Sequence, residues 1–199
     1  MPVEEVPLAR ALGRVLGADV VAAVALPSFD NSAMDGYAVR AAEVAGAPVE
    51  LPVAADIPAG RTDVPVLEPG SVHRIMTGAP LPTGADAVVQ VELTDGGTQR
   101  VRVDRAVAVG TAVRRAGEDV RVGDTVLTAG TVLGPPQIGV AAAVGLATLP
   151  VRRRPHVLVL STGSELVAPG TPLLPGQIYE SNGPMLAAAV EDAGGAAEL

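Results

Sequence analysis

The sequence contains no cysteine and only two histidines, His73 and His156, which stand far apart. Without cysteine the protein can form no disulfide bond, thiolate nucleophile or thiolate-ligated metal site. Two isolated histidines are too few for a transition-metal cluster, and because both fall in strand patterns we expect them to be structural. A metal held by this protein would be a hard cation with oxygen ligands, and Mg²⁺ is the cation that we expect.

Lysine is also absent, so all 14 basic residues are arginines, and 22 acidic residues give a formal net charge of −8. This balance excludes a broad electrostatic surface for nucleic acid or anionic lipid. No apolar run is long enough to span a membrane, and the opening MPVEEVPLAR lacks the basic-then-apolar order of a signal peptide. We expect a cytoplasmic protein without nucleic acid or membrane partners, in which any anion is held locally.

Aromatic residues make up only 2% of the chain, so the core must consist of Val, Ala, Leu and Ile. A high valine content favours strands. From VELPVAADI to DTVLTAGTVL, short apolar runs alternate with proline and glycine, which is typical of β-hairpins. The N-terminal stretch predicts a short helix through Leu8 and Leu12 that ends near Gly13, then a strand over about residues 15–24.

The pattern changes in the last third of the sequence. The stretch GPPQIGVAAAVGLATL predicts a small-residue helix that begins at prolines and ends at Gly145. After RRRP, an apolar strand in HVLVLSTGSELV runs into a Ser-Thr-Gly turn, and a second helix follows ESNGP and ends at Gly194. This order predicts the start of a parallel α/β domain. Because one strand and one helix cannot cover their own apolar faces, we expect further residues to complete it.

Polar residues concentrate in FDNSAMDGYAVR, residues 29–40, where Asp30 and Asp35 stand among Asn, Ser and Gly. One interpretation is a turn, in which Asx and Ser side chains bond the local backbone and Gly36 supplies a positive φ. The other is a surface loop that presents oxygen ligands to a cation or a polyanionic substrate. The local residues leave both interpretations open.

Four stretches occur in order between residues 27 and 182: PSFDNSAMDGYAVR, RIMTGAPLPTGADAVVQVE, RRAGEDVRVGD, and LSTGSELV followed by GQIYESN. Together they resemble the signature stretches of the molybdopterin molybdenumtransferase family, which comprises the molybdenum insertases, MoeA and the gephyrin E-domain. The resemblance implies a mixed α/β, multi-lobed fold, with β-rich N-terminal lobes before an incomplete, doubly wound α/β domain of the molybdopterin-binding type. It implies a connecting and dimerisation lobe at 1–24 and 124–152, an inserted β-rich lobe at 25–123, and the α/β domain from 153 to 199.

The same resemblance implies an enzyme of molybdenum cofactor biosynthesis. Such an enzyme inserts molybdate into adenylylated molybdopterin and releases AMP, uses Mg²⁺ and works as a homodimer. The sulfurs that capture molybdenum belong to the pterin substrate, so a protein without cysteine can perform this chemistry. One alternative is a non-catalytic dimeric scaffold of the same fold that binds partner proteins. A generic nucleotide-binding α/β protein is the other, although the chain has no glycine-rich phosphate loop with a lysine.

The resemblance implies four catalytic residues, Asp35, Thr77, Asp119 and Glu165, with Asp35 also as a magnesium ligand. Each position also has a simpler interpretation. Thr77 could end a strand, and Asp119 could belong to a solvated turn. Glu165 could complement the dipole of a helix in its first turn.

The residues implied to bind substrate are Glu118, Ser161, Thr162, Gly163, Ser164 and Asn182. The Ser-Thr-Gly turn lies where the end of a strand meets anions, and Arg114 and Arg115 could clamp an anion as well. Asn182 could equally cap a helix. The chain departs from the family at one point, because STGSEL stands where family members commonly have STGDEL. The hydroxyl of Ser164 carries no charge for a cation, which argues against Mg²⁺ ligation there.

Overall fold

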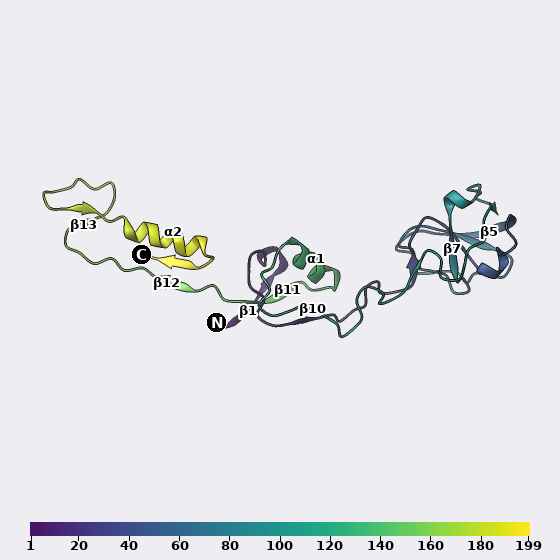
Figure 1. The fold of residues 1–199 in the computed structure, drawn as a ribbon, viewed down its shortest axis with the longest axis horizontal. Helices are drawn as coiled ribbons and strands as arrows, with labels where there is room; N and C mark the ends of the chain where they lie inside the picture. Colours follow the sequence, from purple (N-terminus) through teal and green to yellow (C-terminus); the bar gives the residue numbers. More distant parts are fainter. The chain divides into compact units, whose positions relative to one another are not determined.

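A computed structural model describes residues 1–199, which form two compact units. Unit 1 comprises Met1–Val20 and Thr125–Leu199, and unit 2 comprises Val21–Asp124. The protein is mostly β-structure with two α-helices, α1 (Pro135–Ala143) and α2 (Asn182–Asp192) (Figure 1). The predicted separation of residues 153–199 from the connecting lobe stays a prediction.

Unit 2 contains a five-stranded sheet in the order β7-β4-β6-β5-β8. Its strands are β4 (Gly36–Val39), β5 (Val49–Ile57), β6 (Val72–Ile75), β7 (Ala87–Gln90) and β8 (Arg100–Val103). Strands β5 and β6 are parallel, whereas the other neighbours are antiparallel. The prediction of hairpins throughout this region was therefore wrong for this pair. A tight turn cannot join parallel neighbours, so the chain between β5 and β6 forms a crossover.

The remaining elements of unit 2 are short. Strand β3 (Asn31–Ser32) pairs antiparallel with β9 (Val113–Arg114), and two 3₁₀ turns, η2 (Ala41–Glu43) and η3 (Val91–Leu93), flank the sheet strands. Valine and alanine dominate the buried residues, as the composition predicts. Tyr37 is the one large aromatic side chain in this core, and its hydroxyl donates a 3.0 Å hydrogen bond to the carbonyl of Gly97.

His73 lies in the centre of this sheet, opposite Ala38 of β4 and Ala55 of β5. Its side chain is buried, and its Nδ1 atom has no hydrogen-bond partner. Burial, together with the charge of Arg61, lowers the pKa of His73 below the usual value. The histidine is therefore neutral and part of the core, in agreement with its expected structural role.

The lowered pKa of His73 makes unit 2 sensitive to acid. Below the unfolded-state pKa of about 6.5, the unfolded chain binds a proton that the folded chain resists, so the free energy of unfolding falls as pH decreases. We expect urea denaturation between pH 7.5 and pH 5 to show this loss in the wild type and a smaller loss in His73→Gln. His156→Gln is the matched control, because that exposed histidine lies in unit 1 and its replacement leaves the sheet of unit 2 untouched.

In unit 1, β1 (Val3–Pro7) pairs antiparallel with β11 (Thr148–Arg152), and α1 lies near β10 (Thr125–Leu127). The predicted N-terminal helix is wrong beyond one 3₁₀ turn, η1 (Leu8–Arg10), because the residues before it form β1 and pair with β11. Gly13, with a positive φ of 73°, turns the chain where the helix was expected to end. The predicted strand over residues 15–24 is reduced to β2 (Val20–Val21). Helix α1 agrees with its prediction, and Gly145, with φ of 84°, follows its end.

The last part of unit 1 contains one β–α–β unit, in which β12 (His156–Leu158) runs parallel to β15 (Ala196–Glu198) and α2 connects them. A second parallel pair, β13 (Leu166–Val167) and β14 (Ile178–Tyr179), is inserted between β12 and α2. A complete doubly wound domain needs more strands, so that prediction stays open.

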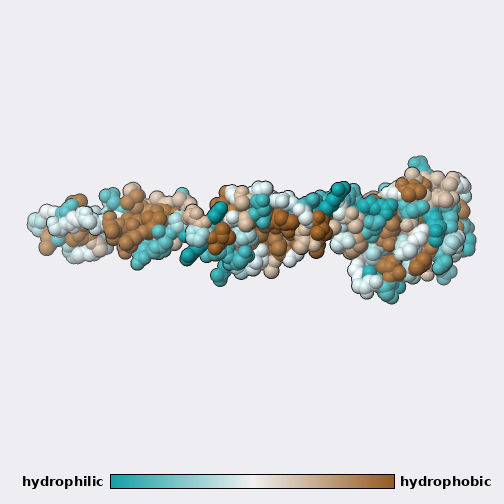
Figure 2. Space-filling view, turned by 90° about the horizontal axis from the view of Figure 1, so that it is seen from below, coloured by the Kyte–Doolittle hydropathy of each residue, from teal (hydrophilic) through white to brown (hydrophobic).

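Figure 2 shows apolar surface over this part of the chain, where the exposed apolar side chains include Leu158, Leu160, Ile178, Met185 and Leu186. Neither helix combines the length and the apolar character needed to cross a bilayer.

Candidate functional site

Asp35 and Thr77 form a hydrogen-bonded pair on the surface of unit 2. Asp35 immediately precedes β4, and Thr77 follows the neighbouring strand β6 in a turn that Gly78 closes with φ of 77°. The Oδ1 atom of Asp35 accepts two hydrogen bonds from Thr77, one from the backbone N–H at 2.7 Å and one from the hydroxyl at 2.8 Å. Residues that lie far apart in the sequence are therefore held together in one exposed arrangement.

The hydrogen bonds from Thr77 lower the pKa of Asp35, and the positive charge of Arg74 adds to the effect. The carboxyl group is therefore ionised at neutral pH. Its second oxygen, Oδ2, forms no hydrogen bond within the protein and is open to solvent. Thr77 fixes the orientation of the carboxylate, and the free oxygen can bind a cation or accept a proton from a ligand.

Gly36 is required here for a different reason from the one predicted. It does not take a positive φ; instead, a Cβ atom at this position would lie 1.9 Å from the carbonyl oxygen of Val89 in β7. The glycine allows β7 to approach β4 at the point where Asp35 leaves the sheet. The local backbone that orients Asp35 therefore depends on close strand packing.

A second charged group surrounds Asp30, at the other end of β3 from Asp35. The Asp30 carboxylate accepts hydrogen bonds from Nη1 of Arg115 at 2.5 Å and from the backbone N–H of Ala116 at 2.8 Å. These bonds, the backbone one foremost, lower the pKa of Asp30. Asp30 therefore joins the loop after β9 to the loop before β3.

The predicted acids of RRAGEDVRVGD lie in this second group, and one oxygen of each is engaged within it. Glu118 accepts a 3.0 Å hydrogen bond from the backbone N–H of Arg115, and Asp119 forms an ion pair with Arg114. The arginines expected to clamp an anion are thus already paired with carboxylates. A ligand that engaged Arg114 would compete with Asp119 for the guanidinium.

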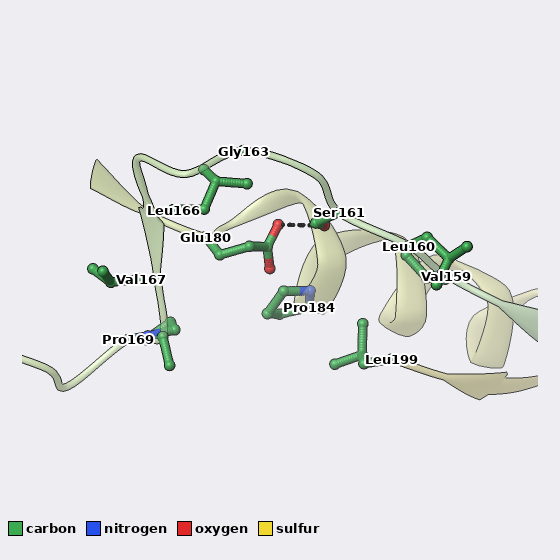
Figure 3. A pocket seen from close by; sticks show the side chains of 11 residues that line it. Val159, Leu160, Ser161, Gly163, Leu166, Val167, Pro169, Glu180, Pro184 and Leu199 are labelled. Atoms are coloured by element: carbon green, nitrogen blue, oxygen red, sulfur yellow. Dashed lines mark hydrogen bonds between the residues drawn. The ribbon is translucent and has the colours of Figure 1, made fainter. Parts of the chain in front are cut away.

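The other predicted residues lie in unit 1, around a pocket of about 500 Å³ next to the N-terminus of α2 (Figure 3). Glu180 is the only acidic side chain in its lining. Its Oε1 atom accepts a 2.9 Å hydrogen bond from the Ser161 hydroxyl and a 2.7 Å bond from the Gly183 N–H. The lining is otherwise largely apolar and consists of Val159, Leu160, Ser161, Gly163, Leu166, Val167, Ala168, Pro169, Glu180, Pro184 and Leu199.

Only part of the predicted substrate-binding set lines this pocket. Ser161 and Gly163 do, whereas Thr162, Ser164 and Asn182 are exposed residues outside its lining. Glu165 is also exposed and lies in a turn before β13, so the interpretation as a residue in the first turn of a helix was wrong. The STGSEL stretch continues into a strand because Leu166 and Val167 pair with β14.

Glu180 is the pocket residue that the sequence interpretation missed. The sequence left open a capping role for Asn182, but Asn182 is the first residue of α2, and Ser181 at the N-cap makes no side-chain capping bond. Glu180 satisfies the Gly183 N–H instead. An acid just before a helix N-terminus was the available signal, since that position favours negative charge.

The predicted catalytic residues are thus divided, with Asp35, Thr77 and Asp119 in unit 2 and Glu165 in unit 1. No group of three or more His, Cys, Asp or Glu side chains is placed to hold a metal ion. Asp35 could offer its one free carboxylate oxygen to Mg²⁺. Mg²⁺ commonly takes one or two carboxylates together with phosphate oxygens of a substrate, so a single ligand of this kind fits that ion.

Residues 1–145 match the family described as MoeA N-terminal region (domain I and II). Over 195 residues the chain is 62% identical to molybdopterin molybdenumtransferase 2 of Mycobacterium tuberculosis (strain ATCC 25618 / H37Rv), which covers 96% of this chain and 48% of that protein. It is 40% identical over 199 residues to the molybdopterin molybdenumtransferase of Bacillus subtilis (strain 168), with 96% of this chain and 46% of that protein covered.

Among solved structures, the molybdopterin biosynthesis moeA protein of Pyrococcus horikoshii OT3 superposes with a TM-score of 0.88 at 37% identity. The match covers 99% of this chain and 54% of that one. The chain thus spans about half the length of the relatives that it matches.

Proposed function

The chain belongs to the MoeA N-terminal region family, and from this premise we propose that the complete protein is a molybdopterin molybdenumtransferase of molybdenum cofactor biosynthesis. In the proposed reaction, molybdate enters the dithiolene of adenylylated molybdopterin and AMP is released. The observation that carries the proposal for this chain is the Asp35–Thr77 pair, an ionised carboxylate with one fixed and one free oxygen.

In this proposal the protein positions the substrate and compensates charge, since the reacting sulfurs belong to the pterin. Asp35 is the catalytic carboxylate, and Thr77 holds it in a single orientation. Mg²⁺ is the proposed cation, with the free Oδ2 of Asp35 as its protein ligand; when bound, it would neutralise charge on the substrate's phosphate oxygens. Asp119, Glu118, Glu165, Ser161, Thr162, Gly163, Ser164 and Asn182 remain proposed contacts of the substrate.

We further propose that the protein is a cytoplasmic homodimer. The exposed apolar side chains Leu12 and Val132 of unit 1 provide surface that a second copy could bury. Sedimentation velocity at micromolar concentration should give the mass of a dimer. A protein that sediments only as a monomer at this concentration would contradict the proposal.

The function is tested by incubating the purified complete protein with adenylylated molybdopterin, molybdate and Mg²⁺. We expect AMP release that depends on both molybdate and protein, together with formation of the molybdenum-loaded cofactor. The alternative, a non-catalytic scaffold, is not favoured because the curated relatives are named as transferases. It would gain support if the folded protein released no AMP.

A further inference from the structure

Four arginines line one small pocket in unit 1, although the chain as a whole has a net charge of −8. The pocket has a volume of about 190 Å³ and lies between the turn at Gly13, the stretch that follows β11 and the end of α2. Its lining consists of Met1, Gly13, Arg14, Val15, Arg152, Arg153, Arg154, Pro155, Ala193 and Gly194. It is separate from the Asp35–Thr77 pair, the group around Asp30 and the pocket next to the N-terminus of α2.

Arg14 is the least exposed of these arginines, with only 10% of its side chain accessible. Its Nη2 atom donates to Oε1 of Glu4 at 2.6 Å and to the carbonyl of Arg152 at 2.7 Å. Its Nε and Nη1 atoms bond no protein atom, and neither is sealed from solvent. The pocket therefore contains a guanidinium that the protein holds in place and that has N–H donors available for a ligand.

The positive charge around the pocket exceeds the negative charge that pairs with it. Glu4 is the only carboxylate in ion pairs with these arginines, and it is shared between Arg14 and Arg153, the latter at 3.9 Å. Arg152 donates to the carbonyl of Met1 at 2.8 Å, and Arg154 has neither an ion pair nor a hydrogen bond. The acidic residues Glu191 and Asp192 precede the lining residue Ala193, but they form no ion pair with the arginines.

A structural role alone does not account for four arginines here. The end of α2 lies at the pocket, and its last turn has no basic residue, so a nearby cation would complement the helix dipole. One cation suffices for that effect. Arg14 and Arg152 also connect the N-terminal strand to β11, whereas Arg154 makes no such bond. At least part of the positive charge therefore neither complements the helix dipole nor connects the N-terminal strand to β11.

We propose that this pocket binds a small, multiply charged oxyanion of the phosphate type, free or as the terminal group of a phosphate ester. Guanidinium groups bind such oxygens with two parallel, charge-assisted hydrogen bonds. At about 30 Å³ per water molecule, the space corresponds to about six waters, and it is below the range of about 300–1,000 Å³ that is typical of larger organic ligands. The proposal does not depend on the proposed transferase activity.

Calorimetric titration of the complete protein with inorganic phosphate at low ionic strength tests this site. We expect binding in the wild type and an increase in Kd of about tenfold or more in Arg154→Gln, because a charge-assisted hydrogen bond is lost. Arg154 bonds no protein atom, so the variant should keep the wild-type melting temperature. The matched control is Arg105→Gln in unit 2, which removes the same charge from another arginine without an ion pair and should leave Kd unchanged.

Glycerol 3-phosphate distinguishes the two forms of the ligand. If glycerol 3-phosphate competes with inorganic phosphate, the site accepts a phosphate ester. If it does not compete, the ligand is a free oxyanion. The proposal is overturned if the wild type binds no phosphate or if Arg154→Gln binds it as tightly as the wild type. It is equally overturned if Arg105→Gln weakens binding as much, because the effect would then reflect net charge.

Discussion

Replacing Gly36 with alanine should lower the free energy of unfolding of unit 2 by about 3 kcal/mol, as for a severely overpacked core position. The added Cβ atom would meet the Val89 carbonyl oxygen at 1.9 Å, far inside van der Waals contact. Gly36 lies opposite Gln90 of β7 and Ile75 of β6, so the backbone cannot move away from one neighbour without disturbing the other. Urea denaturation followed by circular dichroism and by tyrosine fluorescence, to which the buried Tyr37 contributes, measures the loss.

Gly46→Ala is the matched control for this change. A methyl group added at Gly46 would meet no atom within 4 Å, and this glycine does not take a positive φ, so the substitution should cost little there. The smaller entropy of the unfolded chain could even stabilise this variant slightly. Equal urea midpoints for Gly36→Ala and the wild type would contradict the packing argument.

The sequence predicted elements well where local signals and packing agree. Prolines at the start of α1 and a glycine after its end marked that helix, and the same signals marked α2. The prediction of an N-terminal helix was wrong because it rested on the apolar spacing of Leu8 and Leu12 and took no account of the strand with which the preceding segment pairs. Strand β1 pairs with β11, far away in the sequence, and such contacts leave no local signal.

Sheet order in unit 2 illustrates the same limit. The apolar runs of β5 and β6 are visible in the sequence, but their parallel pairing is not, because a crossover and a long hairpin loop have similar composition. Likewise, Gly36 was recognised as important beside Asp35, but the reason for it, a carbonyl oxygen of β7, became apparent only in three dimensions.

The candidate site was predictable to the extent that its residues lie in recognisable stretches. Asp35 and Thr77 were named from two separate stretches, and the structure brings them into hydrogen-bond contact. The pairing of Asp30 with Arg115 and of Asp119 with Arg114 was not predictable, since charge alone does not fix which of several acids and arginines meet. Glu180 was overlooked because Ser and Asn beside it are the more usual capping residues.

Replacing Asp35 with asparagine should reduce molybdenum insertion by the complete protein on the order of 10²-fold or more, if the carboxylate acts on the reacting groups as proposed. The amide oxygen of asparagine can accept both hydrogen bonds from Thr77, so the loop should keep its geometry. The amide nitrogen would then occupy the position of the free Oδ2, and a charged acceptor would become a neutral donor. Single-turnover insertion, measured beside thermal melting, separates the loss of charge from a loss of folding.

Asp95→Asn provides the matched control, because the Oδ1 atom of Asp95 also accepts two hydrogen bonds, from the N–H groups of Gly97 and Arg102. These bonds lower the pKa of Asp95 much as those from Thr77 lower the pKa of Asp35, yet Asp95 belongs to no proposed site. The control should insert molybdenum at the wild-type rate. If Asp35→Asn also keeps the wild-type rate and melting temperature, the carboxylate of Asp35 has only a structural role in the turn. If both variants lose activity equally, the effect comes from removing a negative charge anywhere on unit 2 and not from chemistry at Asp35.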